Sequence, residues 1–119
     1  MTTKERGDLG ESLAARLLTQ KGFTILERNF HCRYGEIDII CKNGETIVFA
    51  EVKARGKNML GQPAEAVTPG KQRKIVITAT RFLQKNPTPL QPRFDVLEVF
   101  LDETPPKIRH IENAFQVEN

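Results

Sequence analysis

Four charged residues interrupt two otherwise apolar segments of the chain, which read GEIDII and VFAEVK; they are Glu36, Asp38, Glu51 and Lys53. Charged side chains are costly to bury unless they are paired or bind a metal ion. A hard divalent cation such as Mg²⁺ or Mn²⁺ relieves the repulsion between neighbouring carboxylates. A lysine beside such a cation can orient a bound water or stabilise charge on a phosphate. Together these residue types suit the hydrolysis of a phosphodiester bond.

The two segments are expected to form paired strands over residues 36–41 and 46–53. Asn43-Gly44 lies between them and is typical of a tight hairpin turn, because both positions tolerate a positive φ. Both strands are apolar on both faces, as are the central strands of a sheet that is covered on both sides. The predicted faces are Ile37, Ile39 and Cys41 on one side and Ile40, Ile47 and Phe49 on the other.

The turn also predicts which charged side chains share a face. With this turn as a two-residue loop, Asp38 lies opposite Phe49. Glu36 then lies opposite Glu51. Because side chains alternate between faces, Asp38, Glu51 and Lys53 project from the same side of the hairpin. Asp38 and Glu51 are predicted to be diagonal neighbours, about 7 Å apart at the backbone.

Two predicted helices each bring one further polar residue toward this face. The first spans residues 4–21, and Glu11 borders its buried arc, where it could be a further metal ligand. The second begins after the N-cap Thr68 and ends near Lys85. Gln72 falls within its apolar stripe, where it could orient the attacking water or a phosphate.

Each of these polar residues also has a purely structural interpretation. Glu36 could form an ion pair with Lys53 or Arg55 across the strands. Glu11 could form a salt bridge with Arg16, and Gln72 could satisfy a backbone group. For any single residue the structural interpretation is favoured, but it is weaker for Asp38, Glu51 and Lys53 taken together.

Three further strands are predicted, over residues 23–31, 93–101 and 107–113. The order α-β-β-β-α-β-β indicates an α/β protein with a mixed central sheet flanked by helices. A chain of 119 residues with 39% hydrophobic residues is expected to form a single domain, here 1–119 with a core over about 4–113 and a tail over 114–119.

The charge of the chain is unevenly distributed. The net charge is only +3, but the segment 52–94 contains nine basic residues and a single acid, Glu65. Such a segment suggests a surface that contacts a polyanion. Apolar runs near 18 residues and a secretory leader are missing, which predicts a cytoplasmic protein without a membrane partner. Cys32 and Cys41 match no zinc spacing.

These motifs resemble known families at two levels. Asp38 followed after twelve residues by Glu51-Val52-Lys53 resembles the PD-(D/E)XK signature of restriction-endonuclease-like nucleases, with Ile37 in place of the usual proline. A longer pattern over about residues 4–113 resembles the YraN-like bacterial family. It comprises Gly7-x-x-Gly10-Glu11, Asn29-Phe30, Gly35-Glu36-Ile37-Asp38-Ile39-Ile40, Val48-Phe49-Ala50-Glu51-Val52-Lys53-x-Arg55, Lys71-Gln72-Arg73-Lys74 and Arg93-Phe94-Asp95-Val96.

The resemblance implies a restriction endonuclease-like fold with an αβββαβ core, similar in arrangement to archaeal Holliday-junction resolvases. It implies that Asp38 and Glu51 bind Mg²⁺ or Mn²⁺, with Glu11 as a further ligand. Lys53 would be the catalytic lysine, and Gln72 would match a polar helix residue near the site. Asp95 is expected to be structural and to pair with a base on an adjacent strand. Nucleic acid is expected to contact Arg55, Lys57, Lys71, Arg73 and Lys74.

Three functions remain open from the sequence. The first is a metal-dependent nuclease acting on DNA, with branched or damaged structures as candidate substrates, recognised by shape or backbone. Cutting both strands would then imply a homodimer, because one site cuts one strand. The second is a non-catalytic nucleic-acid-binding module that supports DNA repair or recombination. The third is an interaction domain whose acids form only ion pairs.

Overall fold

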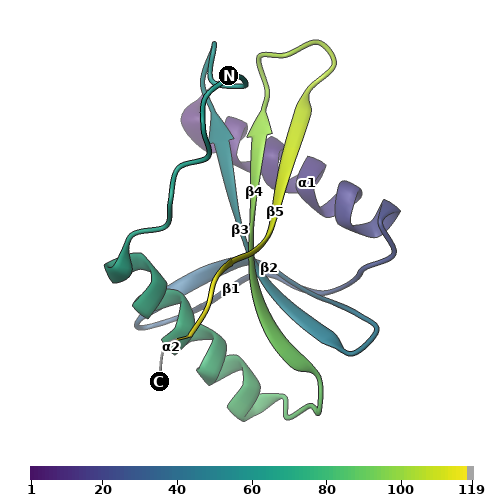
Figure 1. Cartoon of the computed structure of the whole chain (residues 1–119), viewed down its shortest axis with the longest axis vertical. Coiled ribbons are helices and arrows are strands. Elements are labelled where there is room, and N and C mark those ends of the chain that lie inside the picture. Colours follow the sequence, from purple (N-terminus) through teal and green to yellow (C-terminus); the bar gives the residue numbers. More distant parts are fainter. Residues whose placement is uncertain (118–119) are drawn as a thin grey trace.

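Five strands form one mixed sheet, and two helices pack against it (Figure 1). The structure is a computed structural model that describes residues 1–117 of the chain. Its elements are α1 (Thr3–Gln20), β1 (Thr24–Cys32), β2 (Gly35–Asn43), β3 (Thr46–Arg55), α2 (Pro69–Lys85), β4 (Gln91–Phe100) and β5 (Lys107–Phe115). The order of helices and strands is the predicted one, and the N-cap Thr68 is confirmed.

The strands lie in the order β1-β2-β3-β4-β5, so every strand pairs with its neighbour in the sequence. All pairs are antiparallel except β3 with β4, which run parallel. A parallel pair needs a crossover, and the chain between them supplies it by descending from the end of β3 into α2 (Figure 1). This arrangement is consistent with the expected restriction-endonuclease-like α/β fold.

Each helix buries one face of the sheet. On the α1 side the core comprises Ala14, Leu18, Phe23, Ile39, Cys41, Val48, Ala50, Leu97 and Val99. On the α2 side it comprises Ile37, Ile40, Ile47, Phe49, Ile75, Ala79, Phe82 and Phe94. The prediction that Cys41 lies in the core is confirmed, and burial raises the pKa of its thiol to about 12.

One predicted face is wrong at the start of β2. Ile37 packs on the α2 side, although Ile39, two residues later, packs on the α1 side. Strict alternation is therefore interrupted at Asp38. Its neighbour on β1 is Asn29, which lies between the paired positions and adopts a φ of 55°. The regular geometry of β1 is thus interrupted at Asn29, next to the interruption of β2 at Asp38. An alternating pattern of apolar residues in the sequence does not predict such an interruption.

The predicted hairpin register is also wrong, by two residues. Asn43 pairs with Thr46, and Ile40 rather than Asp38 pairs with Phe49. The loop is Gly44-Glu45, in which only the glycine has a positive φ, of 59°. That pattern suits a type II′ turn, which places glycine first, whereas the prediction placed it second. Because the shift is even, it leaves the predicted faces unchanged for the paired residues 39–43 and 46–50.

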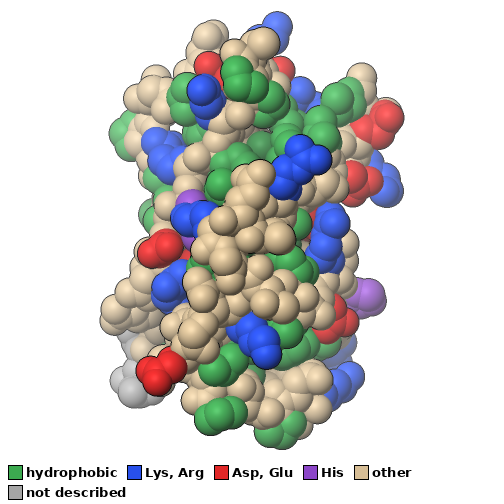
Figure 2. Space-filling view, turned by 90° about the vertical axis from the view of Figure 1, so that its right-hand side faces the viewer, with side chains coloured by type: hydrophobic (Ala, Val, Ile, Leu, Met, Phe, Trp, Pro, Cys, Tyr) green, Lys and Arg blue, Asp and Glu red, His purple; other side chains and the backbone are tan. Residues whose placement is uncertain are grey.

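The remaining observations concern the surface charge, the helices and the C-terminal end of the chain. On the face shown in Figure 2, basic and acidic side chains are interspersed and are not separated into areas of one sign. No helix within residues 1–117 is long and apolar enough to cross a membrane. The final strand continues to Phe115, so the predicted tail boundary at 113 is too early. Residues 118–119 of that tail lie outside the described part.

Candidate active site

Asp38 and Glu51 lie next to each other on β2 and β3. The ladder between these strands pairs Ile39 with Ala50, and the following positions are Asp38 and Glu51. Both residues line the same small pocket, and the charge of Glu51 acts on Asp38, so the two carboxylates are close together. The backbone N–H of Val52 donates a hydrogen bond to Asp38 Oδ2 at 2.8 Å, which ties the carboxylate to β3.

The pKa of the Asp38 carboxyl is raised to about 6, chiefly by burial. The hydrogen bond from Val52 acts in the opposite direction, and the charges of Glu51, Glu11 and Glu36 raise the pKa further. Burial disfavours the charged form, and so does each negative neighbour. The site therefore concentrates negative charge that a bound cation would relieve.

A hollow of about 210 Å³ opens beside Glu51 and Lys53, and the loop after β3 and the start of α2 form its wall. Lys71 of α2 lies 2.8 Å from Glu51 Oε1, and this contact raises the pKa of the lysine. On the opposite wall, Glu65 Oε2 lies 3.3 Å from Lys53 Nζ. Three of the functional groups predicted from the sequence, Glu51, Lys53 and Lys71, therefore already have partners of opposite charge.

Arg55 has two acidic partners. Its Nη1 donates to Glu65 Oε2 at 2.9 Å, and its Nε lies 3.2 Å from Glu98 Oε2. Glu98 is only 1% exposed and also receives a hydrogen bond from Arg109 Nε at 2.7 Å. The structure therefore holds Arg55 in an ion-paired network on the sheet, away from the free position that phosphate binding was expected to need.

Glu11 and Gln72 are also engaged by the protein. Glu11 is buried, and its Oε1 accepts hydrogen bonds from Arg28 Nε and Asn29 Nδ2, both at 3.0 Å. The glutamate still contributes to the negative potential at Asp38. Gln72 donates from Nε2 to the Val67 carbonyl at 2.9 Å, as its structural interpretation predicted.

The remaining predicted nucleic-acid contacts are exposed. Lys57 lies on the connection between β3 and α2, and Arg73 and Lys74 lie on the first turns of α2. The helix thus presents basic side chains next to the carboxylates of β2 and β3. Glu36 is exposed at the edge of the same acidic group.

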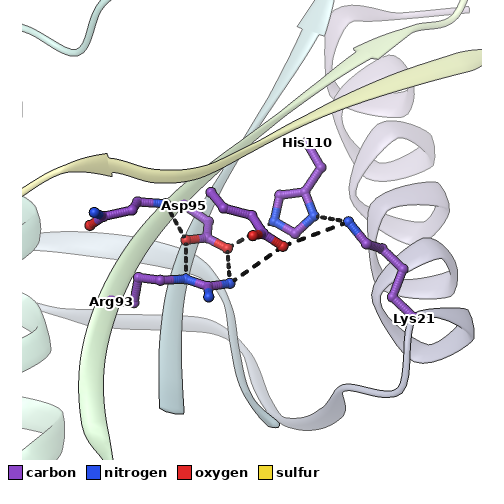
Figure 3. Close-up of polar contacts among 6 residues, drawn as sticks. Lys21, Arg93, Asp95 and His110 are labelled. Atoms are coloured by element: carbon purple, nitrogen blue, oxygen red, sulfur yellow. Dashed lines mark hydrogen bonds and ion pairs between the residues drawn. The ribbon is translucent and has the colours of Figure 1, made fainter.

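Asp95 is structural, as expected, but its environment is richer than the sequence suggested (Figure 3). It is 1% exposed and receives Arg93 Nε and Nη2, each at 2.9 Å, and the N–H of Asn113 at 3.0 Å. Burial raises its pKa, but these hydrogen bonds and that of His110 outweigh burial and hold the pKa below its usual range. A register shift in the β4–β5 ladder and a φ of 52° turn the N–H of Asn113 toward the carboxylate.

His110 extends this network to the surface. Its Nε2 lies 2.8 Å from Asp95 Oδ2, and its Nδ1 lies 2.7 Å from Lys21 Nζ (Figure 3). The lysine ammonium only donates, so Nδ1 accepts and Nε2 donates to Asp95. His110 lies on β5, and its side chain is buried.

Sequence analysis missed the importance of Glu98 and the contacts of Glu65. A signal for Glu98 existed, because it interrupts the apolar segment FDVLEVF in the same way that Asp38 interrupts its own. Glu65 stood out only as the single acid of a basic segment. Its pairing with Lys53 and Arg55 depends on how the connecting loop folds, which no local pattern predicts.

The donor set can be tested for its fit to a divalent cation. Carboxylate oxygens are the ligands that Mg²⁺ and Mn²⁺ prefer. Asp38 Oδ1 and Glu51 Oε2 take no part in the contacts described above, which involve the other oxygen of each carboxylate. Within residues 1–117, no three His, Cys, Asp or Glu side chains are arranged together as a metal site. The pair Asp38 and Glu51 therefore fits a cation that retains several waters, with Glu11 acting at longer range.

The mixed sheet, the two helices and the paired carboxylates define an α/β protein consistent with the restriction-endonuclease-like class. The model of "Uncharacterised protein family UPF0102" matches residues 10–99. The chain belongs to this family, which confirms the resemblance to YraN-like proteins.

Relatives in the family match nearly the whole chain. A UPF0102 protein of Syntrophomonas wolfei is 45% identical over 113 residues, which cover 94% of this chain and 98% of the relative. One from Clostridioides difficile is 46% identical over 118 residues, covering 97% and 100%. One from Caldanaerobacter subterraneus is 47% identical over 116 residues, covering 94% and 95%.

Proposed function

We propose that this protein is a divalent-metal-dependent nuclease that hydrolyses phosphodiester bonds in DNA, with branched or damaged structures as candidate substrates. The observation that carries the proposal is that Asp38 and Glu51 lie close together on β2 and β3, and that Glu51 lines an open hollow together with Lys53. The raised pKa of Asp38 supports it, because such shifts concentrate at sites that bind cations or do chemistry.

In the proposed reaction, the two carboxylates and the two lysines would have different roles. Asp38 and Glu51 would hold Mg²⁺ or Mn²⁺, which when bound polarises a phosphate and activates water. Lys53 would donate a hydrogen bond to a phosphate oxygen or to the attacking water once Glu65 releases it. Lys71 would exchange its partner Glu51 for the substrate phosphate when a cation takes over the carboxylate.

The second candidate is a nucleic-acid-binding module of the same fold that does not cleave. The ion pairs of Glu51 with Lys71 and of Lys53 with Glu65 favour it, because they satisfy the charges without a cation. Under this alternative the exposed bases of α2 would bind nucleic acid in support of repair or recombination.

Calorimetry with Mn²⁺ separates the two. The wild type is expected to bind the cation, and Asp38→Asn and Glu51→Gln are expected to lose binding and cleavage while retaining affinity for DNA. Glu45→Gln is the matched control, because Glu45 is an exposed carboxylate at the turn of the same hairpin. Failure of the wild type to bind Mn²⁺, even with uncleavable phosphorothioate DNA present, would favour the non-catalytic module.

A further inference from the structure

The turn between β1 and β2 presents an aromatic ring with two guanidinium groups close to it. Tyr34 is 39% exposed and is the single tyrosine of a chain without tryptophan. Arg33 Cζ lies 5.2 Å from the centre of its ring, and Arg81 Cζ of α2 lies 5.3 Å from it. Exposed aromatic rings and guanidinium planes are the groups on which unpaired bases stack in proteins that bind single strands.

The turn is held firmly on α2. The N–H of Tyr34 donates to Cys32 Sγ at 3.4 Å, and that sulfur lies 3.8 Å from Thr78 Oγ1. A Cβ added at Gly35 would lie 3.2 Å from Thr78 Oγ1, so the backbone passes very close to the helix. The ring is therefore positioned before any ligand arrives, which lowers the entropic cost of binding.

A basic ridge of α2 connects this ring to the candidate active site. Lys71 contacts Glu51, Lys74 packs beside Gly35, and Arg81 lies over Tyr34. Positions 71, 74, 78 and 81 share one side of a helix, and the ridge is about 15 Å long. Along the chain, the four steps from Tyr34 to Asp38 span about 13 Å. A DNA strand whose phosphates contact the ridge would thus pass both the Tyr34 ring and the candidate active site.

The energies favour exchange of an arginine for a base. A cation–π contact at an exposed site is weak, because water competes for the guanidinium group. Stacking of a base on an aromatic ring is generally the stronger of the two contacts. An incoming base can therefore displace one guanidinium from the ring, and the released arginine is then free to contact a phosphate.

We propose that Tyr34, with Arg33 and Arg81, forms a stacking site for an unpaired nucleobase a few nucleotides from the bond to be cut. This inference rests on the proposed function and specifies its substrate as DNA with a single-stranded segment next to the cleaved phosphate. Fully paired DNA would contact the ridge but not the ring.

The test measures binding alone, in the Asp38→Asn background, so that it does not depend on cleavage. The probes are a short duplex with a single-stranded overhang that carries 2-aminopurine, the same overhang with an abasic site, and the blunt duplex. Tyr34→Ser is expected to weaken binding to the overhang about tenfold, to leave the blunt duplex unchanged and to abolish the change in 2-aminopurine emission. Tyr34→Phe should retain wild-type behaviour, because it retains the ring.

Two further variants make the test specific. Leu26→Ser removes a side chain of similar exposure, 41%, on β1, and is expected to have no effect. Tyr34→Trp creates the only tryptophan of the chain, and its emission should be quenched by the overhang but not by its abasic form. Equally weakened binding to overhang and blunt duplex, or a defect in Tyr34→Phe as large as in Tyr34→Ser, would overturn the proposal. If the stacking results hold but the wild type never cleaves, only the nuclease proposal fails.

Discussion

Asp38 carries a charge into the sheet at a cost in stability. The ordinary pKa of the carboxyl, 3.8, rises to about 6 in the folded protein. Between those values the folded state holds a proton that the unfolded state has released, so stability falls as the pH rises through this window. Above about pH 6 the ionised carboxylate destabilises the protein to its full extent, by about 2–3 kcal/mol.

Asp38→Asn is therefore expected to stabilise the fold by about 2 kcal/mol at pH 7.5. Asparagine retains the oxygen that accepts the hydrogen bond of Val52 but carries no charge. Urea denaturation at several pH values checks this, and the difference should vanish below about pH 3, where the aspartate is protonated in both states.

The matched control is Glu45→Gln, whose carboxylate is exposed at the turn of the hairpin and should leave the stability curve unchanged. A loss of stability in Asp38→Asn at pH 7.5 would show that ionised Asp38 is held by favourable contacts. Added Mn²⁺ should remove most of the advantage of the variant, because the cation compensates the wild-type charge.

At the scale of the element, α2 both covers the sheet and carries the bases that face the site. It starts at Thr68, whose side chain accepts a hydrogen bond from the N–H of Lys71 at 3.3 Å. Thr68→Ala is expected to destabilise the protein by about 1 kcal/mol, since it leaves a helix N–H unsatisfied. Chemical denaturation measures the change.

Thr80→Ala is the control for this prediction. Thr80 is an exposed threonine within the same helix whose hydroxyl donates to the Val76 carbonyl at 2.8 Å. Alanine is a better helix former, so this variant should be neutral or slightly stabilising. Equal destabilisation by both variants would argue against a specific role of the cap.

The bounds of the elements were predictable because each had a local signal. Thr68-Pro69 marked the start of α2, and the apolar runs marked β2 and β3. The register of the β2–β3 hairpin was not predictable, because a glycine with a positive φ can occupy either the first or the second position of the turn. Glu51 lies on the α2 side, as parity predicts, and contacts Lys71 of α2. Asp38 lies where the alternation of β2 is interrupted, and its side chain reaches the backbone N–H of Val52.

The contacts of the site were less predictable than its location. Glu65 reaches Lys53 from a loop, and Lys71 reaches Glu51 from a helix that begins more than a dozen residues later. Such pairs depend on tertiary packing, which no local pattern encodes. Asp95 and Glu98 were recognisable as charges in an apolar strand, but the bases that compensate them come from two other strands as well as their own.

At the scale of the whole molecule, the basic residues of the segment 52–94 are of two kinds: some form ion pairs with acidic side chains, and others are exposed to solvent. Arg55 is held by two acids, whereas Lys57, Arg73 and Lys74 are exposed. Only the exposed bases can release counterions from DNA. The apparent excess of positive charge in the sequence therefore overstates the surface that contacts a polyanion.

The salt dependence of DNA binding should therefore depend on the exposed basic residues and not on the ion-paired ones. Replacing Arg73 and Lys74 by glutamine is expected to lower the slope of log K against log salt by about 0.9 for each phosphate that the variant no longer neutralises. Lys4→Gln is the control, because Lys4 is exposed on α1 and already pairs with Asp8 at 2.9 Å. Fluorescence anisotropy over a range of salt concentrations measures the slopes, and equal reductions in both variants would exclude α2 as the binding surface for DNA.

The crossover between β3 and β4 also orders the events of folding. The antiparallel hairpin of β2 and β3 closes a two-residue loop, whereas the parallel pair must wait for the long connection through α2. Asp38 and Glu51 therefore meet while water and salt still screen their repulsion. Desolvation follows when α2 docks, and a proton or a cation taken up at that step would offset the cost of burying the ionised carboxylate, which links the last stage of folding to the ionic composition of the solvent.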